Sequence, residues 1–269
     1  MNTIITGFPP VTAYELCDPT GVLEAEFEAV VIRVLMQLYT DCIVFPFRPD
    51  VRYDDAIWNP DLALVDRNHG YWFVIEVEIA THHLEKHVLP QVTAFSEGMY
   101  GVNAAEQLAR GVGINLSQAH TLLSVIPRDV VVVSNRYDER WTTKLDSVGV
   151  QHLAIASYRN VTTAQVVHKI DGELIPAQRS IGFGKVRAED GVIVTQIGSF
   201  WKEGVFEIIG PEGAAKWICS ILEGRAWLMK KRGLIEFHDQ AFVQFLLRHD
   251  GSLLVRAPYA HLGLRTVQP

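Results

Sequence analysis

Two glutamates, Glu76 and Glu78, interrupt a stretch that is otherwise apolar from Tyr71 to Ile79. The β-branched and aromatic residues around them predict a β-strand. Side chains two positions apart point to the same face of a strand, so the two carboxylates must lie side by side. Neighbouring carboxylates on an apolar strand repel each other and lose hydration. A divalent cation, a basic partner or solvent must therefore compensate their charge.

A third carboxylate, that of Asp61, opens the preceding apolar run. Turn-forming residues at 67–70 separate the two runs, which predicts a hairpin from Asp61 to Ile79. Three carboxylates close together make the oxygen-rich site that a hard cation such as Mg²⁺ prefers. A cation of this kind can activate water and neutralise charge on a phosphate, and phosphodiester hydrolysis requires both effects.

A polar-faced helix is predicted directly after this hairpin, from 81 to 97. His83, His87 and Gln91 recur on it at four-residue intervals and should share one face. Pro90 lies inside the same segment and should kink it. The order of the segments thus brings a polar helix face next to the strand that carries the glutamates.

The remaining segments of the first part of the chain alternate between helical and strand patterns. This alternation predicts an α/β domain with a mixed sheet over residues 1–175. We expect an extended lead-in at 1–20, helices at 21–39, 117–124 and 139–148, strands at 42–47, 130–133 and 152–158, and a loop at 48–59.

The second part of the chain, residues 176–269, has a different sequence pattern, in which short predicted strands are separated by glycine-containing turns. It predicts a smaller, mostly β domain of barrel-like form, in which an Asp-Gly hairpin turn at 250–251 joins two strands. We expect strands at 184–188, 191–197, 205–209, 217–222, 226–230, 241–248 and 252–256.

Composition narrows the class of protein. The chain has 269 residues, of which 48% are hydrophobic, so it can build a substantial globular core. No stretch of about 20 apolar residues is present and the N-terminus does not resemble a signal peptide, so we expect a cytoplasmic protein without a membrane partner. The three cysteines match no paired metal spacing and should be buried free thiols.

The formal net charge of −7 does not indicate nucleic-acid binding, but the charge is unevenly distributed along the chain. Residues 1–170 carry a net charge of −8, whereas residues 171–269 carry +1. An acidic part that gathers metal ions and a less acidic part that faces a polyanion are compatible with a metal-dependent nuclease. Many neutral interaction domains have the same balance.

The dipeptide Pro-Asp that ends at Asp61 is followed, after 14 residues, by Glu76, Val77 and Glu78. This order and spacing resemble the PD-(D/E)xK nuclease superfamily over roughly residues 21–158. The resemblance implies a restriction-endonuclease-like αβββαβ core. It also implies that Asp61 and Glu76 bind Mg²⁺ or Mn²⁺, with the carbonyl oxygen of Val77 as a further ligand.

This chain departs from the family pattern at Glu78, which occupies the position of the motif lysine. Some restriction endonucleases of the superfamily carry glutamate there, where it can act as base or ligand. The resemblance further implies an auxiliary carboxylate from the first helix, for which Glu28 is the first choice and Glu24 the alternative. Gln91 and Lys86 match positions at which the family holds a phosphate contact or a relocated lysine.

Simpler explanations remain open for the acidic residues. Asp61 can belong to a turn beside proline, and Glu76 and Glu78 can form the solvent face of an edge strand. Glu24 and Glu28 suit the positive end of a helix dipole.

Simpler explanations also remain open for the basic residues. His82, His83 and His87 lack a His-Glu-x-x-His arrangement, so a solvated helix face is favoured over zinc binding. The basic run 230–232 near Trp227 can contact a phosphate backbone or form a solvated turn.

Two hypotheses follow. The first is a metal-dependent nuclease in which Asp61, Glu76, Glu78 and Lys86 are catalytic. DNA is the expected substrate, and the β-rich domain binds DNA or a protein partner, or forms a homodimer. The residues expected to contact nucleic acid are Gln91, Lys230, Lys231 and Arg232.

The second hypothesis is an inactive nuclease fold that serves as a binding or assembly module in a phage, mobile element or defence system. Other enzyme classes lack support, since no nucleophile elbow, Walker loop or dinucleotide fingerprint is present.

Overall fold

The computed structural model describes residues 3–6, 12–211, 213–232 and 242–258. Contacts between Cα atoms divide the chain into two compact units. The first comprises residues 1–67, 72–119 and 128–175, and the second comprises residues 68–71, 120–127 and 176–269.

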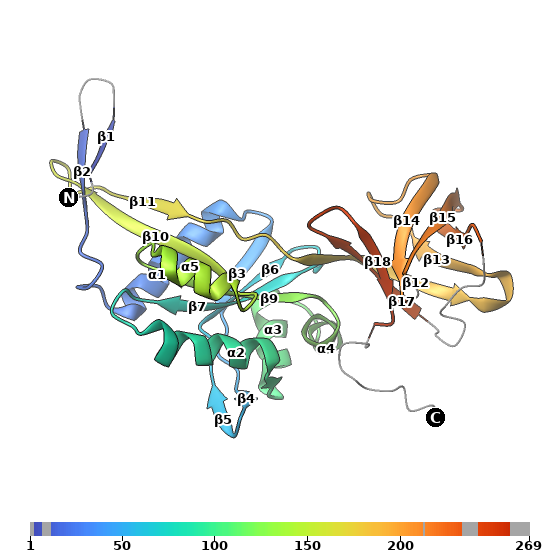
Figure 1. Ribbon diagram of the computed structural model, residues 1–269, viewed down its shortest axis with the longest axis horizontal. Helices are drawn as coiled ribbons and strands as arrows, with labels where there is room; N and C mark the ends of the chain where they lie inside the picture. Colours follow the sequence, from blue (N-terminus) through green and yellow to red (C-terminus); the bar gives the residue numbers. More distant parts are fainter. Residues whose placement is uncertain (1–2, 7–11, 212, 233–241, 259–269) are drawn as a thin grey trace. The chain divides into compact units, whose positions relative to one another are not determined.

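A mixed sheet forms the framework of the first unit, with β7 at its centre (Figure 1). Strands β3, β6 and β7 pair antiparallel, whereas β7, β9 and β10 pair parallel. The strand order is β1-β2-β10-β9-β7-β6-β3, with β11 paired to β10. The bounds are β1 Thr3–Thr6, β2 Thr12–Leu16, β3 Cys42–Pro46, β6 Leu62–Asp66, β7 Trp72–Glu78, β9 Arg128–Ser134, β10 Gln151–Asn160 and β11 Val166–Asp171.

The central strands are buried along most of their length. Every residue of β6 and β7 is buried, as are the four valines of β9. Near-continuous apolar runs of this kind are typical of strands that are covered on both faces. The hairpin predicted over Asp61–Ile79 and the buried strand predicted over 130–133 are confirmed.

Helices α1 and α2 pack against this sheet, α1 on β3 and β7 and α2 on β9. The predicted helices at 21–39, 117–124 and 139–148 are confirmed with slightly different ends. The bounds are α1 Glu24–Leu38, α2 Leu89–Glu97, α3 Asn103–Val112, α4 Leu116–Ser124 and α5 Glu139–Asp146.

One turn of π-helix, η1 Leu84–Val88, leads directly into α2. Within it the N–H of Leu89 donates to the carbonyl oxygen of Leu84, five residues earlier. Pro90 has no N–H and cannot donate to the carbonyl group four residues before it, which favours an irregular turn at this point. The sequence therefore located the irregularity correctly, but its form is a π-turn and not a simple kink.

One expectation for an irregular segment is wrong. The segment 48–59 was expected to be a loop, but it holds a small hairpin. Asp54 and Asp55 form its turn with φ values of 47° and 60°, a conformation that aspartate tolerates well. The lead-in 1–20 contains the antiparallel pair β1 and β2. The additional strands of the small sheet are β4 Val51–Tyr53, β5 Ala56–Trp58 and β8 Met99–Tyr100.

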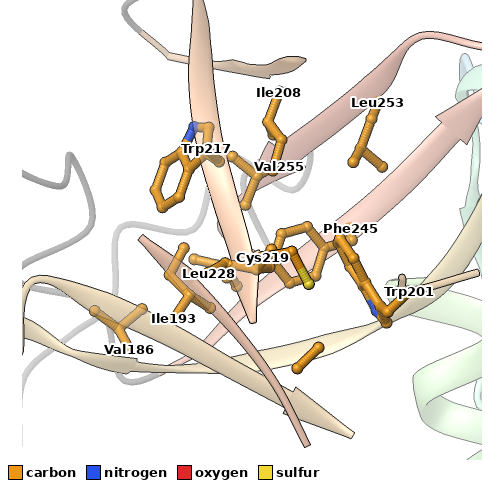
Figure 2. Close-up of a cluster of buried hydrophobic side chains, with 12 residues drawn as sticks. Val186, Ile193, Trp201, Ile208, Trp217, Cys219, Leu228, Phe245, Leu253 and Val255 are labelled. Atoms are coloured by element: carbon orange, nitrogen blue, oxygen red, sulfur yellow. The ribbon is translucent and has the colours of Figure 1, made fainter. Parts of the chain in front are cut away.

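The second unit contains a closed β-barrel, so the expected β-rich, barrel-like part is confirmed. Its interior is filled by apolar side chains, among them Trp201, Trp217 and Phe245 (Figure 2). The strand order is β12-β13-β16-β15-β14-β18-β17. The bounds are β12 Gln178–Arg187, β13 Val192–Gln196, β14 Gly204–Gly210, β15 Gly213–Leu222, β16 Arg225–Lys230, β17 Phe242–Arg248 and β18 Leu253–Arg256.

None of the three cysteines forms a disulfide bond within the described residues; Cys42 and Cys219 are buried, whereas Cys17 is partly exposed. Within the described ranges, no helix is long and apolar enough to cross a membrane.

Gly111 provides a test of the packing between α3 and β3. A Cβ atom at this position would lie 2.2 Å from the Phe45 ring. We expect Gly111→Ala to lower the free energy of unfolding by about 1–3 kcal/mol, because the added methyl group overpacks the core. Gly198→Ala is the matched control, since a Cβ there meets open space. Urea unfolding measures both variants, and equal stabilities would contradict this packing.

Candidate metal centre

Strand β7 presents both glutamates from the middle of the sheet. Glu76 and Glu78 are only 4% and 1% exposed, although each carries a carboxyl group. They pair across the parallel ladder with Val132 and Ser134 of β9. Because β7 lies between β6 and β9, the alternative of a solvent-facing edge strand is wrong. A buried carboxyl group needs a hydrogen-bond donor or a cation, so the partners of these two side chains are informative.

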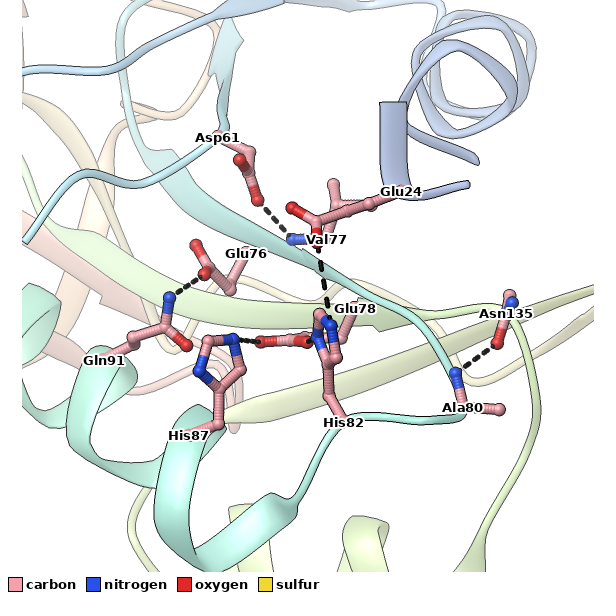
Figure 3. Close-up of polar contacts among 10 residues, drawn as sticks. All are labelled: Glu24, Asp61, Glu76, Val77, Glu78, Ala80, His82, His87, Gln91 and Asn135. Carbon is pink, nitrogen blue, oxygen red and sulfur yellow. Dashed lines mark hydrogen bonds and ion pairs between the residues drawn. The ribbon is translucent and has the colours of Figure 1, made fainter. Parts of the chain in front are cut away.

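Asp61 immediately precedes β6 and is held against β7. Its Oδ2 atom accepts a hydrogen bond of 2.8 Å from the backbone N–H of Val77 (Figure 3). Its own N–H donates to the carbonyl oxygen of Ile75 at 3.2 Å. The carboxylate is therefore oriented by the neighbouring strand, and the alternative of an isolated turn residue does not describe it. The Val77 side chain itself is 1% exposed.

Gln91 of α2 contacts the first glutamate. Its Nε2 atom donates to Glu76 Oε1 at 2.5 Å (Figure 3). Glu76 Oε2 and Gln91 Oε1 are buried and have no hydrogen-bond partner in the described part of the chain. The structure thus uses Gln91 to position a carboxylate, and its expected role as a phosphate contact stays a prediction.

Glu78 lies between two histidines. His82 Nδ1 is in direct contact with Glu78 Oε2, and His87 Nε2 lies 3.7 Å from Glu78 Oε1 (Figure 3). The two imidazole rings are 4.7 Å apart between centroids. Ligand atoms of the three side chains all lie within 4.8 Å of one another, an arrangement that could hold a metal ion. His87 and His83 are exposed, as expected for a solvated face, and His82 is partly exposed, but His82 and His87 also contact the buried carboxylate of Glu78.

Burial changes the acidity of all three carboxyl groups. Loss of hydration raises the pKa of Asp61 to about 6, although the hydrogen bond from Val77 opposes this change. Burial raises the pKa of Glu76 well above its usual value, and the charges of Asp61 and Glu78 add to the effect. Burial also raises the pKa of Glu78 to about 8, while His87 lowers it. The charged forms of these three groups destabilise one another, and a bound cation would stabilise them. The site therefore attracts positive charge.

The first helix contributes two acidic residues with different partners. Glu28 forms a salt bridge of 2.5 Å with Arg48, and its charge also raises the pKa of Asp61. Glu24 Oε2 lies 3.9 Å from His82 Nε2 and therefore joins the histidine cluster. Glu28 as an auxiliary ligand stays a prediction, whereas Glu24, the alternative choice, has the direct contact.

The basic residues expected to act on phosphate lie elsewhere. Lys86 belongs to η1 and is exposed, and within the described residues it forms no hydrogen bond or salt bridge with the carboxylates. The run 230–232 ends strand β16 of the barrel, where the N–H of Lys231 donates to the carbonyl oxygen of Lys216. The nearby Trp227 ring contacts the guanidinium group of Arg187, whose carbon lies 5.4 Å from the ring centroid.

Sequence reasoning missed His82 as a partner of Glu78. Regular helical spacing groups His83 with His87, but His82 lies in the bend before the π-turn, and its ring is 4.7 Å from that of His87 between centroids. The presence of Pro90 was the available signal for such a turn. Asn135 was also missed. It accepts a hydrogen bond from Ala80 N–H at 2.8 Å and donates to the Pro19 carbonyl oxygen at 2.7 Å, and so fixes the end of β7.

Ser134 and His152 form a second polar cluster, at 2.8 Å between Oγ and Nε2. Ser134 is 2% exposed and its hydroxyl group donates to the carbonyl oxygen of Arg136. His152 Nδ1 faces the hydroxyl group of Thr142 at 2.7 Å, and burial lowers the pKa of His152 to about 4. Because the hydroxyl proton of Ser134 is already donated, this pair is a structural network and not an activated nucleophile.

Comparison of the chain with protein-family models, with curated proteins and with solved structures gave no match. The interpretation of the centre therefore rests on its residues and their geometry.

The raised pKa values predict a pH-dependent stability. The folded state binds more protons than the unfolded state, because the folded pKa values of Asp61 and Glu78, about 6 and 8, exceed the ordinary values of 3.8 and 4.5. This contribution is present below about pH 4 and is lost as the pH rises through 6 and 8, at about 1.4 kcal/mol for each pKa unit. In the presence of a chelator we expect the free energy of unfolding to decrease by a few kcal/mol as the pH rises from 5 to 8. The Tm should fall over the same range.

The double variant Asp61→Asn, Glu78→Gln should lose part of this slope, since neither amide titrates, whereas Glu76, whose pKa burial also raises, still contributes. Glu97→Gln on α2 is the control and should keep the slope, because Glu97 lies at the surface. Differential scanning calorimetry at several pH values measures all three proteins. A slope in the double variant equal to that of the unsubstituted protein would contradict the assignment.

Proposed function

We propose that the chain is a metal-dependent nuclease of the PD-(D/E)xK type, with DNA as its substrate. The observation that carries this proposal is the group of three carboxyl groups on and beside β7, of which Glu76 and Glu78 are buried and Asp61 is partly buried. Asp61 is close enough for its charge to raise the pKa of Glu76, and Glu76 keeps an unpartnered buried oxygen in the described part of the chain. Such an arrangement is costly for folding and is typical of a site that serves a charged ligand.

The order of the elements supports the proposal. The helix α1 is followed by β3, β6 and β7, which pair antiparallel, then by α2 and by β9, which runs parallel to β7. This order supports the αβββαβ core that the resemblance implies. The small hairpin of β4 and β5 between β3 and β6, and the helices α3 and α4, are additions to it.

The donor set fits a hard divalent cation. Mg²⁺ and Mn²⁺ favour carboxylate and carbonyl oxygens, and Asp61, Glu76 and the Val77 carbonyl group would supply them. When bound, the cation would lower the pKa of a water molecule and neutralise charge on the phosphate. Glu28 remains a candidate for an auxiliary ligand, since its charge acts on Asp61.

The side chains around the site have supporting tasks. The Val77 N–H keeps Asp61 oriented, and Gln91 keeps Glu76 oriented, so neither carboxylate has to reorganise on binding. Glu78, with a pKa of about 8, can hold or release a proton near neutral pH and therefore suits a general base. Lys86, exposed on η1, would contact phosphate from the helix side.

A second candidate function is an inactive nuclease fold that acts as a binding module. The contact between Glu78 and His82 favours it, because the glutamate at the lysine position is already engaged. In this case the buried acidic cluster would have a structural role, and the barrel would carry the partner surface.

Cleavage assays distinguish the two candidates. We expect plasmid and single-stranded DNA to be cut with Mg²⁺ or Mn²⁺, and Asp61→Asn or Glu76→Gln to lower the rate by at least about 100-fold, since a lost ligand removes several kcal/mol of stabilisation. Glu97→Gln should retain the rate. If DNA remains intact under either metal while the protein is folded, the binding module is the correct description.

The barrel is proposed to contact the DNA backbone through residues 230–232. Replacing Lys231 and Arg232 by alanine should weaken DNA binding and reduce its salt dependence, since each lost phosphate contact removes about one counterion from the slope. Fluorescence anisotropy at several salt concentrations measures both quantities. An unchanged affinity would indicate that the barrel binds a protein partner or a second copy of the chain.

A further inference from the structure

We propose that Glu78, His82 and His87 form a binding site for a first-row transition-metal ion, with Zn²⁺ as the preferred occupant. This site differs from the oxygen-only pair Asp61 and Glu76 in its ligands, because it offers two imidazole nitrogens and one carboxylate (Figure 3). Metal binding here does not depend on nuclease activity.

The distances carry the first part of the argument. The three ligand atoms lie within 4.8 Å of one another, and His87 Nε2 is 3.7 Å from Glu78 Oε1. Tetrahedral zinc with bonds near 2.0–2.1 Å requires ligand atoms about 3.4 Å apart. The spacing in the structure is thus close to the one that a tetrahedral ion requires. Two histidines and one glutamate leave a fourth position for water or substrate, as is usual for zinc sites that are open.

The unpartnered oxygen of Glu78 is an independent observation. Glu78 is 1% exposed, and its Oε1 atom is buried without a hydrogen-bond partner in the described ranges. A buried carboxylate oxygen that lacks a donor is destabilising unless a cation binds it. The side chains of His82 and His87 are 27% and 48% exposed, so an ion can reach the site from solvent.

The ligands are also held in orientation by their surroundings. The second nitrogen of His82 faces Glu24 Oε2 at 3.9 Å, and a carboxylate behind a ligating histidine commonly fixes its tautomer. Asn135 anchors Ala80, two residues before His82, and the π-turn brings His87 to the same side of Glu78. Local backbone and side-chain contacts thus converge on one arrangement of the three ligands.

An ion at this site would add positive charge beside Asp61 and Glu76, at the place where the resemblance expects a lysine. This consequence rests on the proposed function, whereas the binding itself does not. Histidine ligands select Zn²⁺ over Mg²⁺, so the two sites should discriminate between the two metals.

Metal titration of the purified full chain tests the proposal. We expect one Zn²⁺ per chain in isothermal titration calorimetry, and Co²⁺ as a substitute should give visible absorption typical of low-coordinate nitrogen and oxygen ligation. His82→Ala, His87→Ala and Glu78→Gln should each weaken Zn²⁺ binding by about 100-fold or more, because the loss of even an outer-shell partner costs 10–100-fold.

His83→Ala is the matched control, since His83 is exposed and next to a ligand but outside the cluster. It should bind Zn²⁺ as the unsubstituted protein does, and Asp61→Asn should also retain the Co²⁺ spectrum. Circular dichroism without metal shows whether each variant is folded. Unchanged affinity in folded His82→Ala and His87→Ala, equal loss in His83→Ala, or no Zn²⁺ binding at all would overturn the site and leave the cluster as an ion pair. Zinc binding without DNA cleavage would retain the site and reject only the nuclease.

Discussion

The burial of carboxyl groups on the central strand is the constraint on which the rest of this structure depends. Glu76 and Glu78 are almost fully covered, and Asp61 stands beside them at the start of β6. Removing their hydration opposes ionisation, and each charge raises the pKa of its neighbours. The fold offers one donor to each group, from Val77, Gln91 and His82, which compensates part of the cost and leaves buried oxygens available to a cation.

The secondary structure around β7 serves this arrangement. Parallel pairing with β9 and antiparallel pairing with β6 make β7 an interior strand of the sheet, and all of its side chains are buried. The π-turn before α2 brings His87 to Glu78, and Gln91 follows one helical turn later on Glu76. Asn135 connects the end of β7 to the segment before α1. Donors from several distant parts of the chain therefore meet at one strand, which gives a preorganised site.

The same geometry explains why Glu78 is the decisive residue for function. In the proposed nuclease it stands where a lysine is expected, yet its surroundings contain two imidazoles and a carboxylate from α1. A glutamate in this setting can accept a proton or bind a cation, but it cannot supply positive charge itself. A nuclease would therefore need another source of positive charge beside Glu78, whereas a binding module would not. Because His82 and His87 offer nitrogen ligands, a transition-metal ion is the chemically suitable source.

The sequence by itself determined the hairpin, the helices α1, α4 and α5, the buried valine strand and the β-rich second part, because periodicity and turn residues act locally, but it did not predict helix α3. It also placed Glu76 and Glu78 on one face. Only the tertiary structure decided that β7 is central, that Gln91 holds Glu76 and that His82, rather than His83, joins His87 at Glu78. Strand order depends on long-range packing, which residue spacing alone does not specify. The π-turn is favoured because Pro90 has no N–H to donate, and helical spacing does not account for this.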